Sequence, residues 1–162
     1  MPQGDAIFPV LNELAARVSV VVASRDWHPA DHCSFEARGG PWSPHCQAGT
    51  PGAEFHPALD RSHLAEVFSK GTDPDQEAYS AFDGTGLAEW LRARGVRRLL
   101  VGGLATDYCV RASVLDARRE GFEVVVLGDV IGAVEVHQGD GERALAEMRD
   151  AGAEVSRSTD IA

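Results

Sequence analysis

The stretch RRLLVGGLATDYCVRASVLDARREGFEVVVLG (Arg97–Gly128) contains a complete strand–helix–strand pattern. The apolar run Arg97–Gly103 predicts a strand, the residues Tyr108–Arg119 follow helical spacing, and the β-branched run Glu123–Gly128 predicts a second strand. Two strands joined through a helix by short loops lie parallel in one sheet. This stretch therefore predicts an α/β fold with a mainly parallel sheet that is covered by helices on both faces.

The rest of the chain alternates in the same way. Apolar residues at helical spacing over Ile7–Val18 predict a helix, and the run Ser19–Ser24 is typical of a strand buried on both faces. Further expected elements are a strand at 66–69, a helix at 86–94, a helix at 141–151 and a weak strand at 153–155. Since no repeat, low-complexity tract or linker interrupts this order, we expect one three-layer α/β/α domain over residues 1–162.

The composition is that of an ordinary globular protein, with 44% apolar and 25% charged residues among 162. Acidic residues outnumber basic ones by 25 to 15, so the net charge is −10. Such a surface would repel a phosphate backbone or an anionic membrane, and we expect neither as a partner. Since neither a signal peptide nor a membrane span is recognisable, we expect a cytoplasmic protein with free thiols.

A long segment without periodicity, Arg25–Ser62, contains four of the six histidines and two of the three cysteines. A loop of this length inside a compact domain usually carries function. Asp26 directly follows a predicted strand, and His28, His32 and His45 come after it. One carboxylate with three imidazoles suits zinc, iron or manganese and leaves open coordination positions. A polar loop with ordinary hydrogen bonds remains an alternative, as does a structural zinc site.

That structural zinc site would use Cys33 or Cys46. Each of these cysteines is adjacent to a histidine in the sequence, which makes ligation by both neighbours awkward. We therefore rank the structural site below an open site built from Asp26 and the histidines.

Cys109 is placed just after a predicted strand, in the first turn of a helix. Unpaired backbone N–H groups and the helix dipole should lower the pKa of a thiol there and stabilise an oxyanion. The alternative is a small buried cysteine that packs the helix onto the sheet. Lys70 closes another predicted strand and should lie at the same edge. A thiol beside a metal site favours an amide or ester hydrolase over a redox protein, since the sequence has no C-x-x-C pair.

Asp107 precedes Cys109 by two residues and is interpreted as a helix cap. No other residue near the predicted site is an obvious base for the thiol.

Several segments together resemble the nicotinamidases, metal-containing members of the isochorismatase-like cysteine hydrolases. Their order and spacing extend through nearly the whole chain, and the metal-type loop separates nicotinamidases from relatives without metal. The matching segments are Asp26-Trp27-His28, WSPHCQAGTPGAEFHP (Trp42–Pro57), FSKG (Phe68–Gly71), AYSAF (Ala78–Phe82) and GLATDYCVRASVLDA (Gly103–Ala117).

This resemblance implies a divalent metal that holds the pyridine nitrogen of nicotinamide, with zinc favoured and iron and manganese as alternatives. It implies that Cys109 attacks the carboxamide carbon to form a thioester, from which water releases nicotinate, in a reaction of NAD salvage. Lys70 would belong to the catalytic triad, and the N–H groups of Ala105 and Cys109 would form the oxyanion hole. The Leu104–Ala105 peptide bond would be cis. The implied metal ligands are Asp26, His28, His32 and His45, and the implied ring pocket is Trp42, Tyr79, Leu104 and Tyr108.

The chain departs from the family pattern at its start. Family members open with a strand that carries D-x-Q-N-D-F or similar, and the first Asp of that strand deprotonates the cysteine. Here Gly4–Ile7 resembles the segment that leads into the first helix, so Asp5 does not replace this base. We therefore expect the isochorismatase-like fold without its first central strand, in a 162-residue form that is poorly folded and nearly inactive.

Two other functions stay open from the sequence. One is another amidase of the same superfamily that acts on a different small carboxamide or ureido compound. The other is a non-catalytic metal-binding domain that has kept the fold without the base. An exposed sheet edge would favour self-association into a homo-oligomer, although the sequence fixes no oligomeric state.

Overall fold

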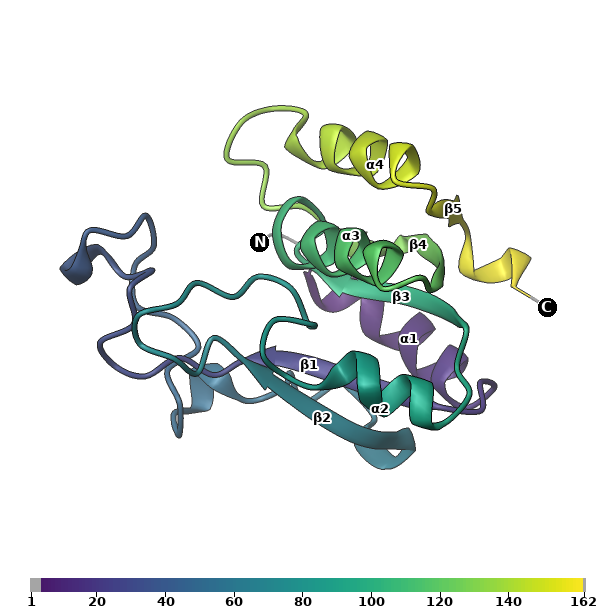
Figure 1. Ribbon diagram of the computed structural model, residues 1–162, viewed down its shortest axis with the longest axis horizontal. Helices are drawn as coiled ribbons and strands as arrows, with labels where there is room; N and C mark the ends of the chain where they lie inside the picture. Colours follow the sequence, from purple (N-terminus) through teal and green to yellow (C-terminus); the bar gives the residue numbers. More distant parts are fainter. Residues whose placement is uncertain (1–3, 162) are drawn as a thin grey trace.

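The computed structural model describes residues 4–161 and confirms the predicted alternation of strands and helices (Figure 1). A short 3-10 turn, Gly4–Ile7, leads into the first helix. The helices are α1 (Phe8–Ala15), α2 (Leu87–Ala93), α3 (Arg111–Arg119) and α4 (Asp140–Asp150). The strands are β1 (Val21–Asp26), β2 (Leu64–Lys70), β3 (Arg98–Leu104), β4 (Glu123–Gly132) and β5 (Glu154–Ser156).

Most predicted boundaries are displaced by a few residues, and two of the differences have a clear structural cause. Strand β4 continues to Gly132 because its pairing with β3 resumes at Ile131, opposite Gly103, after an irregularity in the ladder. The predicted helix that carries Cys109 is split into a π-helical turn, Thr106–Val110, and α3.

The strand pairs in residues 4–161 are all parallel, as expected, and the strands form two sheets. One sheet is β1–β2 and the other has the order β3–β4–β5. This division is consistent with the expected fold without its first central strand, because no strand of residues 4–161 lies between β1 and β3 to pair with both.

Helices cover both faces of the larger sheet, which confirms the predicted three layers. Successive side chains of a strand point to opposite faces, and β4 follows this rule. Val124 and Val126 pack in one core cluster with α3 and α4, whereas Val125 and Leu127 pack in a second cluster with α1. In Figure 1, α3 and α4 accordingly lie in front of the sheet and α1 behind it.

Three strand ends position the functional residues. Asp26 and Lys70 are register partners at the carboxyl ends of β1 and β2. Strand β3 ends at Leu104, directly before the turn that contains Cys109. In open α/β sheets ligands bind beyond the carboxyl ends of the strands, and the polar loop that follows β1 lies at this edge.

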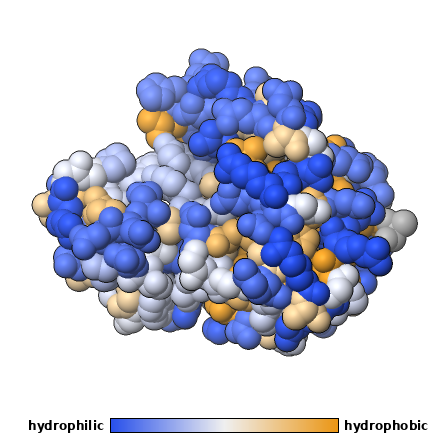
Figure 2. Space-filling view, viewed as in Figure 1, coloured by the Kyte–Doolittle hydropathy of each residue, from blue (hydrophilic) through white to orange (hydrophobic). Residues whose placement is uncertain are grey.

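The surface in Figure 2 is mostly hydrophilic, with apolar residues in small patches. No helix in the described part of the chain is long and apolar enough to cross a membrane.

Candidate active site

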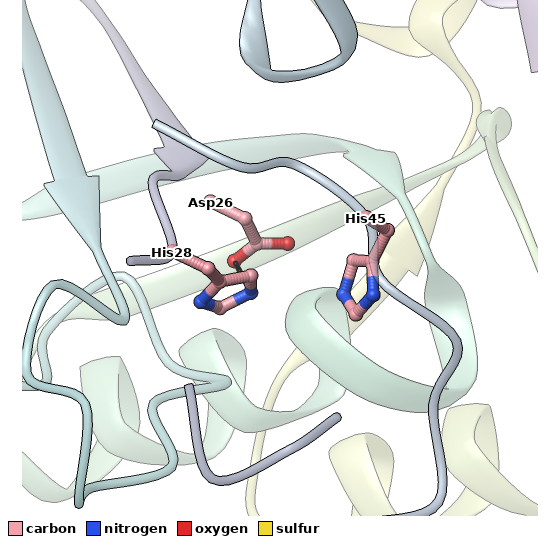
Figure 3. A group of neighbouring side chains, drawn as sticks. All are labelled: Asp26, His28 and His45. Carbon is pink, nitrogen blue, oxygen red and sulfur yellow. Dashed lines mark ion pairs between the residues drawn. The ribbon is translucent and has the colours of Figure 1, made fainter. Parts of the chain in front are cut away.

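Asp26, His28 and His45 form one cluster of possible metal ligands. One donor atom from each lies within 4.8 Å of the others, and the three side chains point toward one another (Figure 3). His45 reaches the cluster because its neighbour Gln47 forms a parallel bridge with His28. The His28 N–H donates to the Cys46 carbonyl at 3.0 Å, which fixes the two segments side by side.

The orientation of both imidazoles fits a metal ion. His28 Nδ1 lies 3.0 Å from the carbonyl oxygen of Gly71, and His45 Nδ1 lies 2.9 Å from that of Ser43. A histidine that donates Nδ1–H to a carbonyl presents a deprotonated Nε2, which is the form that binds metal. Gly71 has φ +62°, and a Cβ there would come within 2.4 Å of the His28 ring. A glycine is therefore required at this contact.

The structure does not bring His32 into this cluster. Its ring is fully buried, with Nδ1 2.8 Å from Ser34 Oγ and Nε2 3.0 Å from the Gln76 carbonyl oxygen. Both nitrogens therefore have protein partners, while the ring lies 4.2 Å from that of His28. Three of the four expected ligands therefore lie together, whereas His32 packs against His28 outside this group. Phe35 makes edge contacts to the His28, His32 and His45 rings.

Neither Cys33 nor Cys46 belongs to the metal-compatible group that the described residues form, so the alternative of a cysteine-ligated site has no support here. All three cysteines are free.

Lys70 links the ligand cluster to the thiol. It is the only lysine in the sequence and is almost fully buried, at 3% exposure. Its Nζ donates to Asp26 Oδ1 at 2.5 Å, to the Ala78 carbonyl at 3.1 Å and toward Cys109 Sγ at 3.4 Å. The single buried ammonium thus contacts both a proposed metal ligand and the candidate nucleophile.

The pKa of Cys109 differs from the one expected for a thiol at a helix start, and the pKa of its neighbour Lys70 is shifted as well. Burial raises the pKa of the Cys109 thiol above its ordinary value, although Lys70 and a hydrogen bond from the Ala105 backbone act in the opposite direction. Burial by itself would lower the pKa of Lys70, but Cys109 and Asp26 outweigh it and the pKa is raised. Lys70 is therefore charged at neutral pH, and the thiol needs a base or this charge to become a thiolate.

The backbone around Cys109 has the expected geometry. The Leu104–Ala105 peptide bond is cis, as the family resemblance implies. The Ala105 carbonyl accepts hydrogen bonds from Tyr108 and Val110, at 3.2 and 3.0 Å, which closes the turn around the cysteine.

The thiol and the ligand cluster open into one cavity of about 290 Å³. All four residues expected to contact the ring line it, and Trp42 Nε1 donates to Tyr79 Oη at 2.9 Å. Tyr108 packs against both, with ring centroids 5.0 Å from Trp42 and 5.6 Å from Tyr79. The lining residues are Asp26, His28, Ser34, Trp42, His45, Glu77, Ala78, Tyr79, Leu104, Ala105, Tyr108, Cys109 and Val134.

The sequence did not indicate that Ser34, Glu77 and Val134 line this cavity, and the interpretation of Asp107 as a helix cap is wrong. The side chain of Asp107 does not cap its own turn but accepts hydrogen bonds from the N–H groups of Val134 and Glu135, each at 2.9 Å. No local pattern in the sequence indicates this contact, because it joins residues about 27 positions apart.

Replacing Lys70 with methionine is expected to raise the pKa of Cys109 further, because the charge that stabilises the thiolate is lost. Alkylation by iodoacetamide proceeds through the thiolate, so its rate at pH 8 should fall about 10-fold and the rate profile should move to higher pH. Lys70→Arg retains the charge and serves as the matched control. A profile that is the same in Lys70→Met and in the unmodified chain would contradict this interpretation.

The chain is similar to several known proteins over most of its length. The isochorismatase domain model matches residues 1–160. The nicotinamidase of Escherichia coli (strain K12) is 38% identical over 178 residues, covering 94% of this chain and 84% of that protein. The pyrazinamidase of Pyrococcus horikoshii, whose crystal structure was solved in complex with zinc, is 47% identical in sequence to this chain. The two structures match with a TM-score of 0.90 over 97% of this chain and 88% of that one.

A third similar protein was solved with a ligand. PnC1 from L. infantum, whose crystal structure was solved in complex with nicotinate, is 38% identical in sequence to this chain. The two structures match with a TM-score of 0.94 over 99% of this chain and 84% of that one. The family model and these relatives all extend over most of the chain, so this protein is a member of the isochorismatase domain family.

Proposed function

We propose that this protein hydrolyses nicotinamide to nicotinate and ammonia, a reaction of NAD salvage. The observation that carries the proposal is the shared cavity, in which Cys109 faces the same space as Asp26, His28 and His45. Relatives named nicotinamidase or pyrazinamidase, one of them solved with zinc, and a similar structure solved with nicotinate support the same substrate class.

Asp26, His28 and His45 would hold one divalent metal ion, with zinc favoured by this mixture of imidazole and carboxylate ligands. When bound, the ion supplies a Lewis-acid contact for the pyridine nitrogen of the substrate. Trp42, Tyr79, Leu104 and Tyr108 surround the ring with apolar and aromatic surface, which orients the carboxamide toward Cys109.

The chain's own residues would then carry out the two chemical steps. Cys109 Sγ attacks the carboxamide carbon, the C–N bond breaks, and the thiol proton leaves with the amide nitrogen as ammonia. The N–H groups of Ala105 and Cys109 stabilise the oxyanion, and Lys70 stabilises the thiolate from 3.4 Å. Water finally cleaves the thioester, which yields nicotinate and restores the thiol.

The charges of the cavity favour a neutral aromatic amide over the alternative class of small amides or ureido compounds that carry a carboxylate. Its acidic lining residues are Asp26 and Glu77, and within residues 4–161 no lysine or arginine lines it. A substrate carboxylate would therefore meet the Glu77 carboxylate without a lysine or arginine on the cavity lining to pair with.

An ammonia-release assay with added Zn²⁺ tests this proposal directly. We expect kcat/KM for nicotinamide to exceed that for maleamate, a small anionic amide, by at least about 100-fold, or nearly 3 kcal/mol of discrimination. A preference for maleamate would support the alternative amidase. Zinc binding without any ammonia release, and without substrate protection of Cys109 from a thiol probe, would support a non-catalytic metal-binding domain.

We further infer that residues 1–162 form one domain, since Phe68 of β2 packs in the same core cluster as α3 and β4. The cytoplasmic location and the homo-oligomer stay predictions.

A further inference from the structure

Asp107 lies in the turn that carries Cys109 but is directed at another segment of the chain. It is largely buried, at 8% exposure, and each of its carboxylate oxygens accepts one backbone N–H. The two donors, Val134 and Glu135, are consecutive residues in the loop between β4 and α4. Within residues 4–161 both oxygens of Asp107 are thus hydrogen-bonded to this loop and not to Cys109.

The far side of the same loop is fixed by Glu135. This residue has φ +58°, in the left-handed region that favours glycine, so its backbone needs support from its surroundings. Its carboxylate accepts hydrogen bonds from the N–H groups of Gly139 and Gly141, at 2.7 and 2.8 Å, at the start of α4. The loop is therefore held to the turn of Cys109 by Asp107 and to α4 by Glu135.

Val134 is the residue that this loop presents to the cavity. The large apolar side chains that stay exposed in the described chain are Leu104, Val134 and Val136, at 36%, 40% and 54%. Leu104 and Val134 both line the cavity, so an aromatic ring bound there would cover apolar surface that is otherwise in contact with water.

We propose that Asp107 is a positioning residue that holds Val134 as one wall of the ring cavity. It thereby sets the affinity for the aromatic ring rather than the rate of amide cleavage. This inference rests on the proposed hydrolysis of nicotinamide.

The test is a double-mutant cycle on nicotinamide hydrolysis. Asp107→Asn keeps the shape but offers one acceptor oxygen to two N–H donors, so KM should rise about 10-fold with kcat changed less than about 2-fold. Val134→Ala removes part of the apolar wall and should raise KM about 5-fold. If Asp107 acts through Val134, the double variant should show about 10-fold rather than the 50-fold product of the two. Full additivity, or a fall in kcat at constant KM, would overturn the proposal.

A second measurement does not depend on turnover. Amide hydrogen exchange at Val134 and Glu135 should accelerate about 10-fold in Asp107→Asn, and the affinity for nicotinate, measured by calorimetry, should fall by a similar factor. Asp129→Asn is the matched control, because Asp129 accepts from Ser158 N and Oγ, at 2.8 and 2.5 Å, outside the cavity. Unchanged exchange at residues 134–135 would refute the proposal. If the unmodified chain does not hydrolyse nicotinamide, the proposed function fails, while exchange and nicotinate affinity still decide the role of Asp107.

Discussion

Replacing Cys109 with alanine is expected to reduce the turnover of nicotinamide by at least about 10⁴-fold, because the sulfur atom forms the covalent intermediate and no substitute nucleophile occupies its position. The binding of zinc should stay unchanged, since Cys109 is not one of the three residues that form the metal-compatible cluster. Steady-state ammonia release and calorimetric titration with Zn²⁺ measure the two quantities separately.

Cys33→Ala is the matched control for this prediction. Cys33 is also a free, half-buried thiol, but it does not line the cavity, and its loss should change turnover less than about 2-fold. If Cys109→Ala retained a tenth or more of the activity, the thioester route would be wrong and hydrolysis would have to proceed by direct attack of water.

Replacing His45 with alanine is expected to weaken zinc binding by about 100-fold or more, because two of the three ligands remain and neither is repositioned to compensate. KM for nicotinamide should rise by a similar factor, since the contact for the pyridine nitrogen is lost. The rate at which iodoacetamide alkylates Cys109 should change little, which separates a lost ring contact from a damaged nucleophile.

His63→Ala controls for the loss of any histidine. This side chain is 41% exposed and lies 4.0 Å from Asp60, outside the cavity. Zinc affinity that is equal in His45→Ala and in the unmodified chain would contradict the assignment of His45 as a ligand.

The sequence predicts most of the fold because apolar periodicity records which faces are buried. The run Glu123–Gly128 illustrates this, since its alternate residues supply the two core clusters on opposite sides of β4. The division into two sheets follows from the lack of a strand between β1 and β3 in residues 4–161. The order of the strands is harder to predict, because strand pairing is a non-local property that each strand's own residues leave open.

The candidate site, like the fold, could be predicted only in part from the sequence. Asp26 ends β1, and His28 and Cys109 follow strand ends, so their convergence could be predicted from strand direction alone. The role of His32 could not, because its nitrogens are taken up by Ser34 and by Gln76, which is distant in sequence. The lowered thiol pKa was also wrong, since the helix-start argument considers local dipoles and leaves out the burial that dominates here.

The separation of the two sheets has a consequence for catalytic alignment. Asp26 and Lys70 belong to one sheet, whereas Cys109 follows a strand of the other. Within the described chain no backbone ladder joins β1 to β3, so the 3.4 Å approach of ammonium and sulfur is set by interlocking side chains such as Phe68, Val22 and Val101. A cavity-forming substitution among these distant apolar residues would shift one half of the catalytic machinery against the other, and activity would be lost before the chain unfolds.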